Sequence, residues 1–148
     1  AERRLQAVIA DCRLQDLLAR HPYDMSAGER QRLALAKLLL TEADILLLDE
    51  PTKGLDARGK QELAAMLARL RREGRSIALV THDIEFAAAH AETAALLFGG
   101  ALISQGPARR FFAENNFYTT AANRIARGCF PLAVTSGELI AAAREARA

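Results

Sequence analysis

Two short apolar runs, each closed by acidic residues, place the strongest constraint on the fold of this chain. The first is DILLLDEP, residues 44–51, and the second is SIALVTHD, residues 76–83. Between them, KQELAAMLARLRREG (60–74) has the apolar period of an amphipathic helix, with Gly74 suited to its carboxyl-terminal cap. Strand, helix and strand in this order predict a parallel strand pair with a crossover helix, both strands being buried on two faces.

Two helices are expected before the first strand. The apolar period of residues 5–18 predicts a helix that runs to about residue 20, where His21-Pro22 interrupts it. Ser26 and Glu29 have the S-x-x-E spacing of a capping box, so a second, mostly buried helix should begin there.

The second half of the chain predicts shorter elements. A helix is expected over residues 84–92, followed by strands over 93–98 and 101–106, joined by a hairpin turn at Gly99-Gly100. After Pro107 the pattern predicts short helical segments, the last opened by a T-x-x-E capping box. These segments are expected to form a small helical extension.

Composition narrows the function classes. The chain has 148 residues, of which 51% are apolar, so it can bury a core and one domain is the starting expectation. Its 20 basic and 18 acidic residues leave a net charge of +2, and aromatic residues make up 5%. A nucleic-acid-binding protein usually carries a basic stripe or stacking aromatics, so no nucleic-acid partner is expected.

The cysteines and the apolar runs indicate the cellular environment in which the chain is expected. Cys12 and Cys129 have no CxxC pattern or His/Cys cluster beside them, so neither a zinc site nor a disulfide framework is indicated. No apolar run approaches the roughly 20 residues needed to cross a bilayer, and the first residues carry no signal-peptide pattern. A reduced, cytosolic environment is therefore expected.

Candidate catalytic residues follow the carboxyl ends of the two predicted strands, where ligands bind in α/β sheets. Asp49 is suited to hold Mg²⁺ through water, and Glu50 to polarise an attacking water. His82 can donate a hydrogen bond to a phosphoryl oxygen, and together these are parts that a nucleoside triphosphatase needs. Each alone has a plainer interpretation, as a solvated turn residue or as a surface or core histidine.

The predicted helix start at Ser26 also has two interpretations. Taken alone, its spacing indicates only a helix cap. A serine at a helix amino terminus can also bind phosphate, because the backbone N–H groups and the helix dipole present positive character to an anion. The appearance of this helix start, the carboxylates and the histidine in one order favours the phosphate interpretation.

In this order the motifs resemble a known family. MSAGERQRLALAKLLLTEADILLLDEPTKGLD (25–56), followed by LVTHD (79–83), resembles the nucleotide-binding subunit of an ATP-binding cassette (ABC) transporter, over roughly residues 20–106. The resemblance implies an α/β fold with a P-loop NTPase-like parallel sheet flanked by helices. Residues 1–108 would be part of an ABC ATPase domain that lacks its amino-terminal portion. Residues 109–148 would be a helical carboxyl-terminal extension.

The resemblance also implies a role for each motif. Asp49 would end the Walker B strand and position Mg²⁺, Glu50 would be the catalytic glutamate, and His82 would be the switch histidine on the γ-phosphate. Two cassettes of this family sandwich ATP head to tail, so the signature residues would contact ATP held by a partner cassette. These ATP-binding residues are Ser26, Ala27, Gly28 and Glu29, and Asp56 of the D-loop would lie at the same interface.

Two residues depart from the family signature. Ala27 stands where the family has glycine, which adds a methyl near a phosphate and would be penalised if its φ were positive. Glu29 stands where the family has glutamine, which places an acid near a triphosphate and improves the helix cap. Glu29→Gln is therefore expected to leave the ATPase rate of the complete dimer equal or higher.

The family's glycine-rich phosphate loop, Walker A, has no match at the expected place, nor does its following glutamine. GLDARGKQ (54–61) satisfies G-x-x-x-x-G-K, but Gln61 replaces the Ser or Thr whose hydroxyl ligates Mg²⁺. We therefore interpret this stretch as the D-loop. The chain is expected to be the carboxyl-terminal part of a cassette and to be inactive alone.

The narrowest resemblance lies in the tail. DEPTKGLD, THDIEF and FFAENNFYTTAANRIAR look like the second cassette of fused energy-coupling-factor ATPases, which power bacterial uptake of vitamins and metal ions. The implied function is an ATPase subunit that drives solute import at the cytoplasmic face of the membrane, with a second cassette and a transmembrane subunit as partners. The alternatives are a soluble ABC-class ATPase of DNA repair or translation, and a non-catalytic interaction module.

Overall fold

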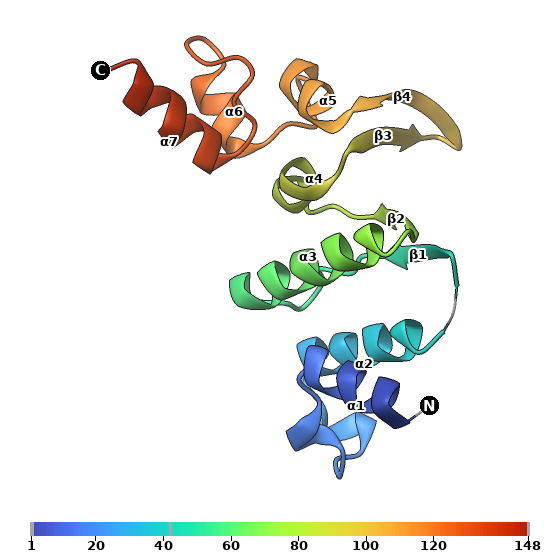
Figure 1. Cartoon of the computed structure of the whole chain (residues 1–148). Helices are drawn as coiled ribbons and strands as arrows, with labels where there is room; N and C mark the ends of the chain where they lie inside the picture. The colour runs from blue at the N-terminus through green and yellow to red at the C-terminus, as the bar shows by residue number, and fades with distance from the viewer. Residues whose placement is uncertain (1, 42, 148) are drawn as a thin grey trace. The chain divides into compact units, whose positions relative to one another are not determined.

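A computed structural model describes residues 2–41 and 43–147. The chain forms two compact units, Ala1–Thr81 and His82–Ala148 (Figure 1). The chain contains both helices and strands, and two of the strands are joined by a helix, which confirms the predicted α/β class. The domain boundary expected after residue 108 stays a prediction.

The first unit contains the predicted strand, helix and strand. Its elements are α1 (Glu2–Asp11), two short 3₁₀ turns (Gln15–Leu17 and Pro22–Asp24), α2 (Ala27–Leu39), β1 (Ile45–Asp49), α3 (Ala57–Arg72) and β2 (Ser76–Val80). β1 and β2 pair in parallel, from Ile45 opposite Ser76 to Asp49 opposite Val80. Gly74 follows α3 with a φ of 92°, a left-handed conformation that glycine adopts without strain. The crossover helix and its glycine cap are therefore confirmed.

The first helix ends well before the predicted residue 20. Arg13 has a φ of 51°, and the Leu14 N–H donates to the Ile9 carbonyl at 2.9 Å, so the backbone turns out of the helix. The apolar residues of this turn and of the 3₁₀ segment after it are nevertheless buried: Cys12, Leu14 and Leu17. The prediction was wrong because the apolar period continued through a turn that packs into the same core.

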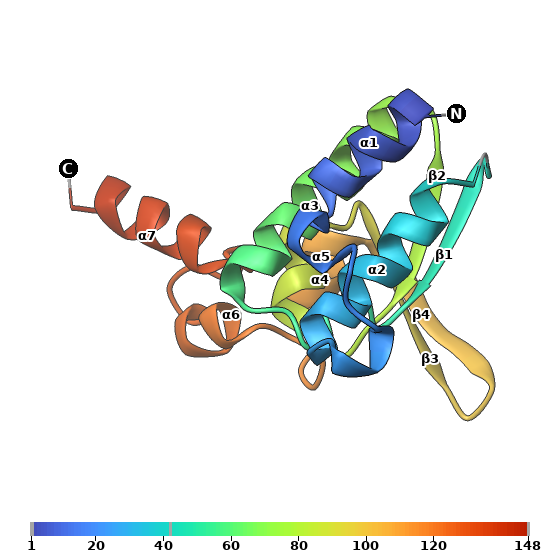
Figure 2. The same cartoon turned by 90° about the horizontal axis from the view of Figure 1, so that it is seen from below.

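The core of the first unit lies between its helices and one face of the β1–β2 sheet. Figures 1 and 2 show α3 beside the two strands and α1 beside α2. The buried cluster consists of Val8, Ile9, Cys12, Leu14, Leu17, Met25, Ala36, Leu39, Leu46 and Leu70. β1 is therefore held in place by apolar packing beneath it.

Burial of both strand faces was predicted, and the structure contradicts it. Leu46 and Leu48 are buried, whereas Ile45 and Leu47 are 64% and 75% exposed, as is Val80 at 67%. Side chains alternate between the faces of a strand, and the helices of this unit cover one face. The four consecutive apolar residues of β1 are therefore not buried on both faces of the strand.

The second unit starts with a helix and a hairpin and ends in three helices. Its elements are α4 (Ile84–His90), β3 (Thr93–Phe98), β4 (Ala101–Pro107), α5 (Ala108–Glu114), α6 (Ala121–Ala126) and α7 (Ser136–Glu145). β3 and β4 are antiparallel, and Gly99 and Gly100 both have positive φ in the turn between them. The hairpin and the short helical segments are thus as predicted, and the Thr135–Glu138 capping box opens α7. None of the helices in the described part of the chain is both long and apolar enough to cross a membrane.

A buried asparagine holds the end of the chain together. Asn123 on α6 is 0% exposed, and its side-chain amide donates to the carbonyls of Pro131 and Ala133 at 2.8 and 3.2 Å. Its side-chain oxygen accepts from the Thr119 hydroxyl at 3.0 Å and from Arg127 at 3.0 and 3.2 Å. The segment that follows α6 is therefore tied to α6 by polar bonds and not by apolar packing alone.

The two cysteines differ in exposure. Both are free; Cys12 is buried and Cys129 is exposed. Burial, and then the neighbouring Asp11 carboxylate, raises the pKa of the Cys12 thiol to about 11. Because the thiolate is the reacting species, a thiol reagent at pH 8 should label Cys129 alone in the folded chain and both cysteines in denaturant. Mass spectrometry counts the labels; rapid native labelling of Cys12 would contradict its placement.

Candidate functional site

Asp49 and Glu50 stand at the carboxyl end of β1, as the sequence predicts. Asp49 is the last β1 residue and is exposed, while Glu50 is half-buried. Glu50 has a φ of 46°, which lies in the left-handed region where residues other than glycine are strained. Its N–H donates to the Val80 carbonyl at 2.8 Å, and its carbonyl accepts from the Lys53 N–H at 3.0 Å. These bonds at both ends hold the strained backbone in place.

The Glu50 carboxylate is bonded to the neighbouring strand end. The hydroxyl of Thr81, just after β2, donates to Glu50 Oε2 at 3.2 Å. The hydroxyl of the buried Thr52 lies 3.4 Å from that of Thr81. Sequence reasoning singled out neither threonine, although Thr81 directly follows a strand whose carboxyl end was expected to lie beside that of β1.

The carboxylates present donors suited to a magnesium ion. Among the described residues, no group of three or more His, Cys, Asp or Glu side chains gathers around a metal position. Mg²⁺ needs no such group, because it commonly takes one or two protein carboxylates and completes its shell with water and phosphate oxygens. The exposed Asp49 carboxylate fits this requirement.

Asp56 caps the helix that follows. It is the residue before α3, and its carboxylate accepts from the Gly59 N–H at 2.7 Å. The stretch 57–60 that mimics a phosphate loop is already helical, and the Lys60 N–H donates to the Asp56 carbonyl at 2.9 Å. A phosphate loop presents free backbone N–H groups around an anion, so this helical stretch supports the D-loop interpretation.

Ser26 and Glu29 form the predicted capping box at the start of α2. The Ser26 N–H donates to Glu29 Oε2 at 2.6 Å, and the Glu29 N–H donates to the Ser26 hydroxyl at 3.3 Å. Arg20 lies 3.3 Å from the other Glu29 oxygen. The hydrogen bonds from Ser26, more than the charge of Arg20, lower the pKa of Glu29 below its ordinary value of 4.5.

The start of α2 lies against the segment after Glu50. A Cβ added to Gly28 would come within 2.8 Å of the Gly54 carbonyl oxygen, and one added to Gly54 within 3.2 Å of the Ala27 Cβ. Gly28 therefore allows this close approach, and Gly54, at φ 77°, also needs glycine's freedom. Ala27 lies in the first turn of α2 and is not among the residues with positive φ, so the penalty that a positive φ would bring does not arise there.

The Glu29 pKa predicts an acid dependence of the cap. A pKa lowered by folding stabilises the native chain above the unfolded pKa, and this contribution is lost as pH falls through the folded value. The wild-type chain should therefore be more resistant to urea than Glu29→Gln at pH 7, and the difference should shrink as pH falls below 4.5 and vanish once Glu29 is protonated in the folded chain. Urea titrations across this range test it, with the exposed Glu145→Gln as the control. A difference that does not change with pH would contradict it.

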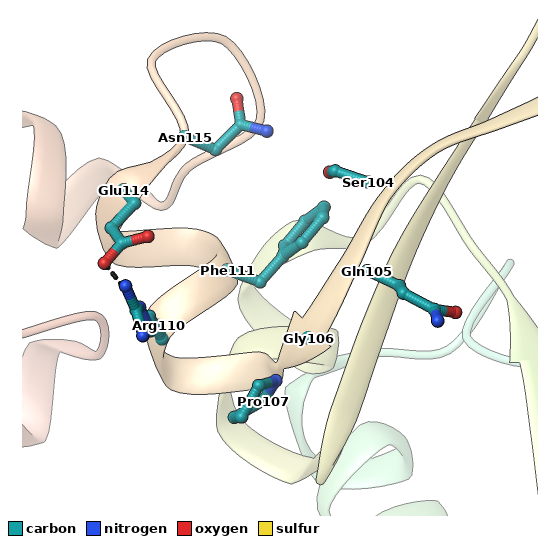
Figure 3. A pocket seen from close by; sticks show the side chains of 8 residues that line it. All are labelled: Ser104, Gln105, Gly106, Pro107, Arg110, Phe111, Glu114 and Asn115. Atoms are coloured by element: carbon teal, nitrogen blue, oxygen red, sulfur yellow. Dashed lines mark hydrogen bonds and ion pairs between the residues drawn. The ribbon is translucent and has the colours of Figure 1, made fainter.

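His82 and a surface pocket belong to the second unit. His82 is exposed, and its carbonyl accepts from the Ile84 N–H at 3.0 Å. The pocket, of about 390 Å³, lies between β4 and α5, where Phe111 projects toward the strand and Arg110 and Glu114 form an ion pair at 2.6 Å (Figure 3). It contains none of the predicted site residues.

Residues 1–53 match the family model described as ABC transporter. A protein of Bacillus thuringiensis subsp. konkukian, provisionally named an ABC transporter ATP-binding protein, is 47% identical over 122 residues, which are 82% of this chain and 22% of the relative. The energy-coupling factor transporter ATP-binding protein EcfA2 of Bacillus cereus is 43% identical over 100 residues, 67% of this chain and 34% of that protein. The chain thus spans 22% and 34% of the length of these relatives.

Solved structures match the fold. The bacterial ABC transporter cassette MJ0796, described as a dimeric structure, has a TM-score of 0.65 at 28% identity, over 72% of this chain and 46% of that one. cbiO1 from Clostridium perfringens, part of the ABC transporter complex cbiONQ, has a TM-score of 0.66 at 28% identity, over 87% of this chain and 49% of that one. This chain thus has the fold of part of an ABC ATPase domain, and its sequence matches ABC transporter ATP-binding proteins.

Proposed function

We propose that this chain is part of an ATP-hydrolysing subunit that powers solute import through an ABC transporter of the energy-coupling-factor type. The match to the ABC transporter family supports the transport ATPase role. The similarity to EcfA2 and to a component of cbiONQ supports the narrower type.

The observation that carries the proposal is the paired carboxylate at the end of β1. Asp49 is exposed beside Glu50, whose backbone and carboxylate are both bonded to the end of β2. Asp49 would hold Mg²⁺, which neutralises phosphate charge when bound, and Glu50 would orient and polarise the attacking water. His82 would donate a hydrogen bond to the γ-phosphate as charge develops there.

The partners follow from the same proposal. Ser26, Ala27, Gly28 and Glu29 would face ATP bound by a second cassette arranged head to tail, with Asp56 at the interface. The exposed Ser26 hydroxyl at a helix amino terminus suits an anion, and the dimeric structure of a similar cassette supports the pairing. A transmembrane subunit would place the assembly at the cytoplasmic face of the membrane, with no nucleic-acid partner.

Titration of Mg²⁺-ATP by calorimetry tests whether this chain binds ATP by itself or only within the full-length protein with its partner. We expect no binding to the 148-residue chain, because its sequence holds no complete phosphate-loop motif and its nearest match is helical. The full-length protein with its partner should bind and hydrolyse ATP. Stoichiometric micromolar binding by this chain alone would contradict the assignment of the D-loop, and a full-length protein without ATPase activity would overturn the proposed function.

A further inference from the structure

The hydroxyls of the buried Thr52, in the loop after β1, and of Thr81, just after β2, form a hydrogen-bonded series that ends at the Glu50 carboxylate. Thr52 is 5% exposed, and its Oγ1 lies 3.4 Å from Thr81 Oγ1. Thr81 Oγ1 in turn lies 3.2 Å from Glu50 Oε2. All three residues belong to the first unit, so the arrangement is internal to one compact body.

The chemistry of the three groups determines which hydroxyl is the donor in each of these hydrogen bonds. An ionised carboxylate can only accept, so Thr81 donates its single hydroxyl hydrogen to Glu50. Thr81 then has no hydrogen left for Thr52, and Thr52 must be the donor in the bond between the two hydroxyls. Each hydroxyl is therefore oriented by the next, and the bond to Glu50 comes from a fixed direction.

The placement of Glu50 in the fold determines what its hydrogen bond from Thr81 can do. Glu50 is half-buried, and its backbone is already bonded to the Val80 carbonyl, one residue before Thr81. One carboxylate oxygen is thus anchored to the residue that directly follows β2. We propose that Thr81, oriented by Thr52, is the positioning residue that holds the Glu50 carboxylate for attack by water on the γ-phosphate. This inference rests on the proposed function of Glu50.

Thr81→Val in the full-length protein with its partner tests the proposal. Valine keeps the branched shape and removes the hydroxyl. We expect kcat for ATP hydrolysis to fall about 10- to 100-fold, because a misplaced catalytic group loses rate by this order. The KM for ATP and the affinity for ATP should stay unchanged, since Thr81 acts on the water-positioning carboxylate and not on the nucleotide.

Two variants separate the hydroxyl from packing. Thr81→Ser keeps the hydroxyl and loses the methyl, so it should recover most of kcat. If only the methyl mattered, Thr81→Val would keep the wild-type kcat and Thr81→Ser would lose it. Thr93→Val, an exposed strand residue outside the site, should leave kcat unchanged. If Thr81→Val does not fold, Thr81→Ala takes its place in the same comparison with serine.

A double variant tests whether Thr81 acts through Glu50. In a Glu50→Gln background, Thr81→Val should cause no further loss of residual hydrolysis. An independent loss there, or wild-type kcat in Thr81→Val, overturns the inference while the proposed function stands. A wild-type protein that does not hydrolyse ATP overturns the proposed function instead, so the two failures are distinguishable.

Discussion

Replacing Glu50 by glutamine should abolish steady-state ATP hydrolysis in the full-length protein while ATP remains bound. Glutamine has nearly the shape of glutamate but cannot polarise water as a carboxylate does. General-base catalysis accounts for about 10²- to 10⁴-fold in rate, so a loss of this size is expected. Glu50 already lies in a strained backbone conformation that bonds to β2 maintain, which is common for residues held at functional sites.

Two measurements together decide this prediction. Phosphate release gives the rate, and retention of labelled ATP after gel filtration shows whether the bound state accumulates. Glu145→Gln removes an exposed carboxylate on α7 and should behave as wild type. Unchanged hydrolysis in Glu50→Gln would remove Glu50 from its proposed role, and loss of both hydrolysis and binding would indicate damage to the fold.

Replacing Asn123 by alanine should destabilise the second unit strongly. The change leaves the buried carbonyl of Ala133 without its amide donor, and it removes the oxygen that accepts from Thr119 and Arg127. An unsatisfied buried polar group costs about 1–3 kcal/mol. The Pro131 carbonyl and the Arg127 guanidinium also lose bonds, so we expect a loss of about 2–4 kcal/mol in the free energy of unfolding of this unit.

Amide hydrogen exchange measures this loss within the second unit. Protection should fall in α6 and in the segment around Pro131 and Ala133, while β1 and α3 in the first unit keep theirs. Ile125→Ala is the matched control, because Ile125 lies on the same helix and is 84% exposed. Its effect should stay within about 0.5 kcal/mol. Equal protection in Asn123→Ala and the control would show that the polar network contributes little.

The predictable elements are those specified by neighbouring residues. β1, α3 and β2 follow from short apolar runs around an amphipathic helix, and the hairpin follows from Gly99-Gly100. Capping boxes at Ser26 and Thr135 mark the starts of two helices correctly. In each case the signal and the structure lie within a few residues of each other, so local backbone preference is enough.

The wrong predictions concern where side chains finally pack. The apolar period up to Leu18 predicted a longer first helix. In the structure the backbone turns at Arg13, and the following residues reach the core from a 3₁₀ turn. Likewise, the apolar residues of β1 did not reveal that Ile45 and Leu47 lie on an exposed face. Periodicity reports which residues are apolar, whereas the cover on each face is decided by other parts of the fold.

The sequence by itself determined which residues could form a nucleotide site: Asp49 and Glu50 after one strand, and the capped helix start at Ser26. Only the tertiary structure decided how they are held. Parallel pairing of β1 with β2 brings Thr81 to the Glu50 carboxylate, and the Gly28–Gly54 approach sets the helix start against the loop after Glu50. These contacts join residues distant in the chain, and their geometry exists only once the strands have paired and the core has closed.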